Sequence, residues 1–206
     1  WFKDGFCAEE IEQSARTGVS VYRLLDGLAE RTDGMGDLIA LPHFAGALSP
    51  ESDPSATGAL YGLTLSTTKG HIARAILESV GFMLRENVES LERLGVAVET
   101  VRSLGGGARS RLWSSIKADI LNRPVATMET EEATALGAAM LCAVSLGWYG
   151  SVDEACREIS RIAETHRPDA DRAPEYERKY RLYRALCRRL REARDDMRTN
   201  GGQRRG

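Results

Sequence analysis

The sequence predicts an α/β fold in which amphipathic helices are layered on short strands. From residue 69 onward, segments with the apolar spacing of a helix alternate with short apolar runs typical of strands. Strands expected over 99–104 and 124–128 flank one helix, and this order predicts a parallel pair joined by a right-handed crossover. A length of 206 residues, with 42% apolar and 28% charged residues, suits one sizeable globular domain.

The first half of the chain is expected to form helices around one long loop. The clearest helix is predicted over 69–94, where apolar residues recur every four positions at Ile72, Ile76, Val80, Leu84 and Val88. The elements expected before it are two short helices across 8–31 that break near Thr17-Gly18, a strand over 38–41, a loop over 42–58 and a strand over 59–65. A loop of this length is longer than a simple connection and often carries function.

The second half is expected to alternate strands and helices. After the strand at 99–104, the elements expected are a helix over 110–121, a strand over 124–128, helices over 131–147 and 151–159, and a long helix that ends near Met197. Pro168 and Pro174 predict a break before the long helix. The domain is expected to cover residues 1–198, followed by a disordered tail over 199–206.

Composition excludes several classes of protein. No apolar run reaches the roughly 18–20 residues that span a membrane, and the start shows no signal peptide. The four cysteines and three histidines lack the spacing of a zinc site and are far apart in sequence, so no metal site and no Cys-His pair is indicated. Free thiols fit a cytoplasmic protein. The first residue is Trp1, which suggests a fragment or processed product.

A glycine run, Gly105-Gly106-Gly107, lies between a predicted strand and a predicted helix that begins near Ser110. Glycine allows unusual backbone angles and close approach of a ligand. A helix N-terminus offers unpaired N–H groups and a partial positive charge. Together these features predict a site for a phosphate or another electron-rich part of a nucleotide. The alternative is a tight turn without a ligand.

Two further segments, together with the glycine run, form a recognisable set of motifs. Residues 58–78 combine a strand, a turn and an amphipathic helix, and residues 132–139 contain the small residues Ala133, Ala135, Gly137, Ala138 and Ala139. With the glycine run, in this order and at this spacing, they resemble the C-terminal half of the FGGY family of carbohydrate kinases. The resemblance covers about residues 1–187.

The resemblance implies an RNase H-like, actin-like ATPase fold, in which this chain is the C-terminal half of a two-domain sugar kinase without the first strands of its domain. It implies ATP as the cofactor, with Mg²⁺ held through the ATP phosphates. The residues implied to contact the nucleotide are Gly105, Gly106, Gly107 and Ser110. The residues implied at the hinge or the cleft are Ala135, Gly137, Ala138, Pro50 and Asp53.

The resemblance also implies that the catalytic machinery lies elsewhere. The general-base Asp belongs to the family's N-terminal domain, so no catalytic residue and no direct metal ligand is expected in this chain. The isolated chain is therefore expected to be inactive. The implied partners are ATP or ADP, a sugar or polyol, and an N-terminal kinase domain, with no nucleic acid and no membrane. A homodimer is left open.

The resemblance implies that the substrate is a pentulose such as xylulose. This expectation rests on Ser110 in the glycine motif and on the sequence of residues 117–121. One departure concerns the loop, because many pentulose kinases carry Gly-Glu-Arg-Thr/Ser-Pro where this chain has Gly46-Ala47-Leu48-Ser49-Pro50. The effect of Ala47 and Leu48 on specificity is open.

Two other functions remain as alternatives. One is a non-catalytic nucleotide-binding or interaction module of the actin-like class. The other is a nucleic-acid-binding protein that uses the basic segment 172–206, which holds 12 Lys and Arg against 5 Asp and Glu. Arginine stems that cover apolar surface on a solvated helix explain the same charge. A Rossmann dehydrogenase is poorly supported, because the chain has no G-x-G-x-x-G motif and no acidic residue suitably placed after a first strand.

Overall fold

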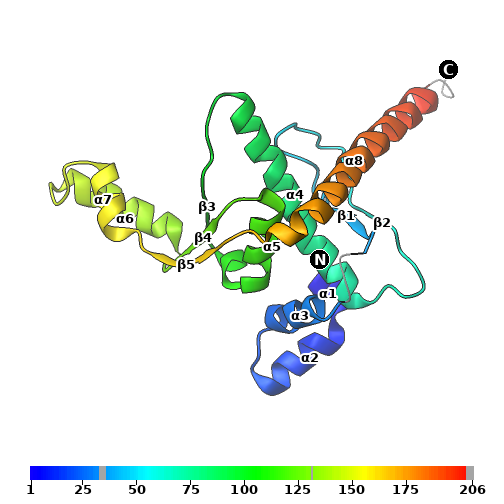
Figure 1. Ribbon diagram of the computed structural model, residues 1–206, viewed down its shortest axis with the longest axis horizontal. Coiled ribbons are helices and arrows are strands. Elements are labelled where there is room, and N and C mark those ends of the chain that lie inside the picture. The colour runs from blue at the N-terminus through cyan, green and yellow to red at the C-terminus, as the bar shows by residue number, and fades with distance from the viewer. Residues whose placement is uncertain (33–35, 131, 203–206) are drawn as a thin grey trace.

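The computed structural model describes residues 1–32, 36–130 and 132–202. Figure 1 shows a central body around one long helix, an arm of two helices on one side, and a C-terminal helix that runs out on the other. The elements of the first half are α1 (Phe2–Phe6), α2 (Ala8–Thr17), α3 (Val21–Glu30), β1 (Ile39–Leu41), β2 (Ala59–Tyr61) and α4 (Lys69–Arg93). Those of the second half are β3 (Val101–Ser103), the 3₁₀ helix η1 (Gly106–Arg109), α5 (Arg111–Leu121), β4 (Val125–Met128), α6 (Ala133–Ser145), α7 (Val152–Ile159), β5 (Ile162–His166), the 3₁₀ helix η2 (Ala170–Arg172) and α8 (Ala173–Gly202).

The strands form two small sheets. β1 and β2 are antiparallel, with Ile39 opposite Tyr61. The second sheet has the order β3-β4-β5, in which β3 and β4 are parallel and β5 is antiparallel to β4. Because α5 connects β3 to β4, the predicted β-α-β unit with its parallel pair is confirmed.

The structure differs from the sequence prediction in five places. The strand expected over 59–65 ends at Tyr61, because Gly62 takes a φ of 91° and turns the chain out of the sheet. α1 and β5 were not predicted, and β5 is mostly exposed, so it shows no apolar pattern. Pro174 lies in the first turn of α8, where proline is tolerated, so it marks no break. Of the tail expected to be disordered, 199–202 belong to α8, and 203–206 lie outside the described residues.

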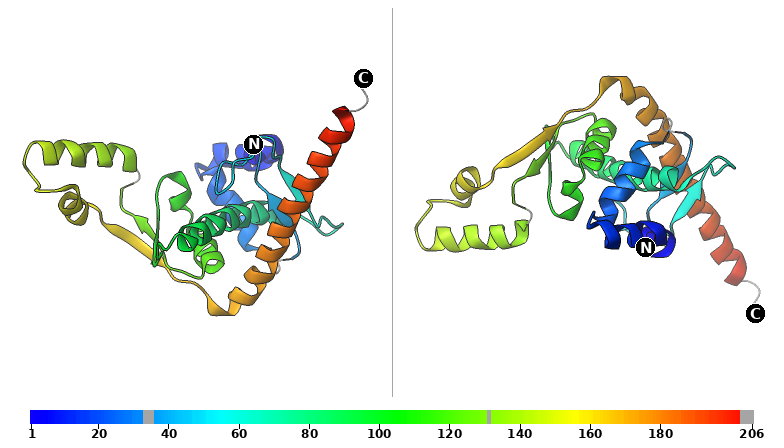
Figure 2. Two further views of the ribbon diagram at one scale, coloured as in Figure 1. Left: turned by 90° about the horizontal axis from the view of Figure 1, so that it is seen from above. Right: turned by 90° about the horizontal axis from the view of Figure 1, so that it is seen from below.

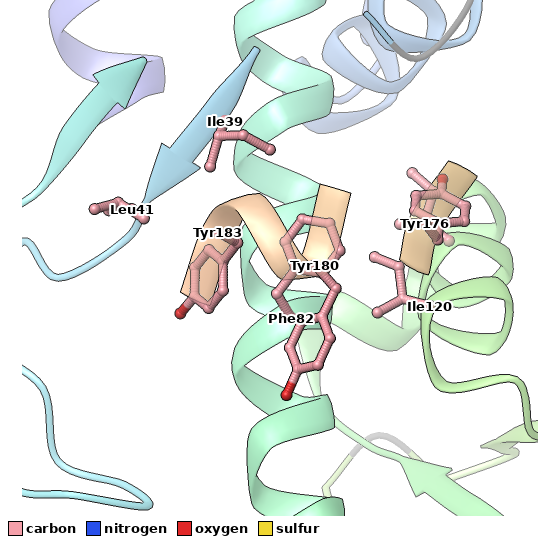
Figure 3. Packing of buried hydrophobic residues seen from close by; sticks show 8 residues of the cluster. Ile39, Leu41, Phe82, Ile120, Tyr176, Tyr180 and Tyr183 are labelled. Atoms are coloured by element: carbon pink, nitrogen blue, oxygen red, sulfur yellow. The ribbon is translucent and has the colours of Figure 1, made fainter. Parts of the chain in front are cut away.

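The main core lies where α8 crosses α4 and α5. Its buried members are Ile39, Leu41, Phe82, Ile116, Ile120, Tyr176, Tyr180 and Tyr183. Figure 3 shows the three tyrosines of α8 beside Phe82 of α4, whose ring centroid lies 5.3 Å from that of Tyr183. Aromatic rings bury large apolar areas, so this contact fixes the first half of α8 to the body.

A buried ionic cluster, formed by Arg74, Glu78, Tyr176 and Lys179, lies beside this core. Arg74 Nε donates to Glu78 Oε1 over 3.0 Å, and Lys179 Nζ donates to the other carboxylate oxygen. Arg74 also donates to the hydroxyl of Tyr176 over 3.3 Å. Burial raises the pKa of Tyr176, so its hydroxyl stays protonated. The cluster joins α4 to α8 through charges that are shielded from water.

The arm formed by α6 and α7 leaves the body at the second sheet. The two helices of the arm pack against each other. Met140 and Ala143 of α6 and Ala155 of α7 are buried. Both views in Figure 2 keep this arm away from α1, α2 and α3. The side chains of Leu141 and Leu146 on α6 are exposed.

Candidate functional site

The glycine run forms the bend between β3 and α5. Gly105 has a φ of 74° and a ψ of −169°, a conformation that side chains rarely adopt. The chain then makes one turn of 3₁₀ helix, η1, before α5 begins. Ser110 is the N-cap of α5, and its Oγ accepts a hydrogen bond from the Trp113 N–H over 3.0 Å. The predicted strand–glycine–helix order is confirmed, and Gly106 and Gly107 themselves form the start of η1.

The glycine run opens onto a pocket of about 790 Å³, which we call the glycine pocket. Gly106, Gly107 and Ser110 line one side of it. The other walls come from α1, α3, α4 and α5, with Trp1, Phe2, Tyr22, Asp26, Ile76, Leu77 and Trp113 among the lining residues. A concave site with mostly apolar walls and a few polar groups is the usual form of a small-molecule site.

Trp113 forms the wall directly behind the run. A Cβ atom at Gly107 would lie 2.7 Å from Cζ3 of this indole, so no side chain fits there without a shift of the ring. The indole Nε1 donates to the carbonyl of Leu77 over 3.0 Å, and Lys117 Nζ lies 4.3 Å from the ring centroid. The indole therefore joins α5, α4 and the glycine run.

Gly106 differs from its neighbour in having open space where a side chain would be. A Cβ atom there would have no other heavy atom within 4 Å, and its backbone lines the glycine pocket. The missing side chain at Gly106 therefore leaves volume for a ligand rather than for packing. Gly105 does not line this pocket, and its role is to turn the chain.

Asp26 is a polar group of the pocket that sequence reasoning missed. It lies on α3, and its carboxylate accepts a hydrogen bond from the side chain of Ser110. Burial raises the pKa of Asp26, and the hydrogen bond from Ser110 opposes this shift. No sequence pattern connects α3 with the glycine run, so only the fold brings the two residues together.

The residues predicted for the hinge lie elsewhere. Ala135 and Ala138 are exposed on α6, and a Cβ atom at Gly137 would meet nothing within 4 Å. No residue of α6 lines the glycine pocket among the residues described. The hinge role of these three residues stays a prediction.

Pro50 and Asp53 line a second pocket, of about 740 Å³, between the 42–58 loop and α8. The Ser55 hydroxyl donates to Asp53 over 2.7 Å and lowers the pKa of this carboxyl, with a further contribution from Arg194 and Arg191. The fold does not bring Pro50 and Asp53 into the glycine pocket. That they border the cleft of a complete kinase stays a prediction.

The described residues hold neither a cluster of metal-binding side chains nor a helix that could span a membrane. Across residues 1–32, 36–130 and 132–202, no group of three or more His, Cys, Asp or Glu side chains is placed to hold a metal ion. Over the same part of the chain, no helix combines the length and apolar character needed to cross a bilayer.

Comparison with known proteins places the chain in a family. The family model described as the C-terminal domain of the FGGY family of carbohydrate kinases matches residues 3–146. Xylulose kinase of Bacillus subtilis is 34% identical over 186 residues, which cover 90% of this chain and 36% of that protein. Glycerol kinase of Ralstonia nicotianae is 38% identical over 169 residues, 82% of this chain and 32% of the relative.

A solved structure shows the same fold. The crystal structure of xylulose kinase from Rhodospirillum rubrum matches 87% of this chain and 36% of its own with a TM-score of 0.74 and 37% identity. The chain thus spans about a third of the length of these relatives. The match confirms the predicted actin-like ATPase fold and the predicted correspondence to the C-terminal half of a sugar kinase. The chain therefore belongs to the FGGY family of carbohydrate kinases, as their C-terminal domain.

Proposed function

We propose that this chain is the nucleotide-binding part of an ATP-dependent carbohydrate kinase and that the glycine pocket holds the adenosine end of ATP. The observation that carries the proposal is the open space at Gly106, on a pocket whose other walls are largely apolar. A flat base is buried well by such walls, and exposed backbone N–H groups of the run are free to meet a ligand at close range.

In the complete enzyme, ATP would supply the phosphoryl group that passes to a sugar hydroxyl, with Mg²⁺ held through its phosphates. This chain would contribute binding and orientation. The glycine run would approach the nucleotide with its backbone, and Ser110, held by Asp26, would present a fixed hydroxyl at the pocket wall. The general base would come from an N-terminal kinase domain, which the family membership supports.

The proposed acceptor is a sugar or polyol, and more narrowly a pentulose such as xylulose. Two of the relatives compared above carry the name xylulose kinase, which supports the narrower choice. A relative named glycerol kinase matches a similar share of the chain, so the broader class rests on more support than the narrower one.

Ion pairs on α8 weaken the nucleic-acid alternative. Several basic residues of α8 are paired with carboxylates: Arg178 with Asp37 over 2.5 Å, Arg191 with Glu51 over 2.6 Å, and Arg189 with Glu192 over 3.0 Å. The ion pairs reduce the positive field that a phosphate backbone would meet.

Replacing Gly106 with valine is expected to weaken binding of a fluorescent ATP analogue to the chain at least tenfold, about 1.4 kcal/mol. A Cβ atom at Gly106 meets no other heavy atom within 4 Å, so the urea midpoint should change little. Gly106→Ala adds only one methyl group and should give a smaller loss. Equal affinity in all three proteins would place the nucleotide elsewhere.

The isolated chain is proposed to show no kinase turnover, because positioning and charge stabilisation of the phosphoryl group need parts on both sides of the cleft. The measurement is ADP release from ATP with and without D-xylulose or glycerol. Sugar-dependent ADP release from the purified 206-residue chain would contradict this expectation.

A further inference from the structure

The pocket between the 42–58 loop, α4 and α8 is separate from the glycine pocket and shares no lining residue with it. We call it the arginine pocket. The arginines that line it are Arg93, Arg181, Arg184, Arg188, Arg191 and Arg194. At about 740 Å³ it is larger than a single inorganic ion requires.

Carboxylates neutralise only some of these arginines. Arg191 pairs with Glu51 over 2.6 Å, and Arg194 pairs with Asp53. Arg188 has no carboxylate partner within the described part of the chain. The guanidinium of Arg188 thus supplies a charge that no other part of the pocket satisfies.

Two buried nitrogen atoms of the same pocket also lack hydrogen-bond partners. They are Nε of Arg194 and Nδ1 of His43. Nε of an arginine always carries a hydrogen, so it is an unused donor. A buried donor without an acceptor costs on the order of 1–3 kcal/mol, which a ligand oxygen would offset.

The Cys187 thiol determines which ring nitrogen of His43 carries the hydrogen. Its Sγ lies 3.7 Å from His43 Nε2, a contact that the separation of these residues in sequence did not indicate. Burial raises the pKa of Cys187 to about 11, so the thiol keeps its proton, and we assign the thiol as the donor to Nε2. Burial also lowers the pKa of His43, which keeps the ring neutral. The neutral ring then carries its hydrogen on Nδ1, which is a second unused donor.

Six carboxylates also line the pocket and have to be compatible with an anionic ligand: Glu51, Asp53, Glu86, Glu89, Glu192 and Asp195. Glu86 has no ion-pair partner among the described residues. Burial raises the pKa of Glu86, which favours its neutral form and reduces repulsion. Arginines engage four of the others: Arg191 pairs with Glu51, Arg194 with Asp53, Arg85 and Arg184 with Glu89, and Arg189 with Glu192.

We propose that the arginine pocket binds a phosphomonoester, whose phosphate oxygens accept hydrogen bonds from Arg188, Arg194 Nε and His43 Nδ1. A phosphate offers three acceptor oxygens and up to two negative charges, which suits several separate donors better than a carboxylate does. The remaining volume holds the organic part of the ligand. This site is independent of the nucleotide site proposed above.

The test is isothermal titration of the 206-residue chain with ribose 5-phosphate, with ribose and inorganic phosphate as separate probes. Ribose 5-phosphate is expected to bind, inorganic phosphate to bind more weakly, and ribose not to bind. Arg188→Gln should raise the dissociation constant for ribose 5-phosphate at least fivefold. The matched control is Arg178→Gln, because Arg178 lies on the same helix, pairs with Asp37 and does not line the pocket, so it should change affinity less than twofold.

Two further variants keep the test decisive. His43→Ala removes one of the unused donors and should also weaken binding, so it replaces Arg188→Gln if that variant fails to fold. Gly106→Val should leave binding of ribose 5-phosphate unchanged, because Gly106 lines the other pocket. Absence of binding to the unaltered chain, equal binding of ribose, or equal affinities of the Arg188 and Arg178 variants would overturn the proposal.

Discussion

Replacing Glu78 with glutamine is expected to lower the free energy of unfolding by about 3–5 kcal/mol. Its carboxylate accepts hydrogen bonds from Arg74 and Lys179 in the buried ionic cluster. Glutamine keeps the shape but removes the negative charge that both cations contact. Two buried positive charges then face a neutral group, and water cannot screen them because the exposed side-chain fractions of Glu78 and Lys179 are 1% and 2%.

Urea unfolding followed by circular dichroism measures this loss, and two other variants on α8 calibrate it. Lys179→Met leaves the pair of Arg74 and Glu78 intact and should cost less than Glu78→Gln. Arg178→Ala removes an ion pair with Asp37 whose side chains are 50% and 68% exposed, so it should cost at most about 1 kcal/mol. If Glu78→Gln costs no more than Arg178→Ala, the cluster does not hold α8 to α4.

Replacing Trp113 with alanine is expected to cost about 2–4 kcal/mol of stability and to weaken binding of an ATP analogue. The indole packs behind Gly107, and its Nε1–H bonds the carbonyl of Leu77. Alanine leaves a cavity there and removes the donor for that carbonyl. The glycine run then loses the wall that holds it against α5, so the pocket is no longer preorganised.

The control for this variant is Trp148→Ala, because Trp148 is 73% exposed and lines neither pocket. It should change stability by less than about 0.5 kcal/mol. Trp113→Phe should fall between the two, since it keeps a ring behind Gly107 but loses the hydrogen bond to Leu77. Unfolding curves and fluorescence titration report the two effects separately. A Trp113→Ala protein with unaltered stability and unaltered nucleotide affinity would exclude the assigned role.

Segments with a strong apolar period were predicted well. α4 was expected over 69–94 and lies at Lys69–Arg93, because one face of a long helix must be apolar wherever it packs. β5 was missed for the opposite reason: it is a short, mostly exposed strand that pairs only with β4. The position of β5 is set by backbone hydrogen bonds to β4, and such pairing requires no particular pattern of apolar and polar residues.

Some residues of the candidate site could likewise be predicted from the sequence, and others could not. The sequence was enough to predict the glycine run, its position between a strand and a helix, and the N-terminal place of Ser110, because these depend on neighbours in the chain. Asp26 was not found, since it meets Ser110 only through the packing of α3. Pro50 and Asp53 line a pocket against α8, a contact that no local pattern indicated, and their place at the cleft of a complete kinase stays a prediction.

The sequence by itself determined the α/β class and the glycine run, because local spacing and the backbone freedom of glycine act over a few residues. Its resemblance to known carbohydrate kinases indicated the family. Only the tertiary structure decided which side chains share a pocket. The glycine pocket is completed by α1 and α3, and the arginine pocket by the arginines of α8 over the 42–58 loop. Contacts between segments far apart in the chain arise when apolar faces are buried together, so no local pattern records them.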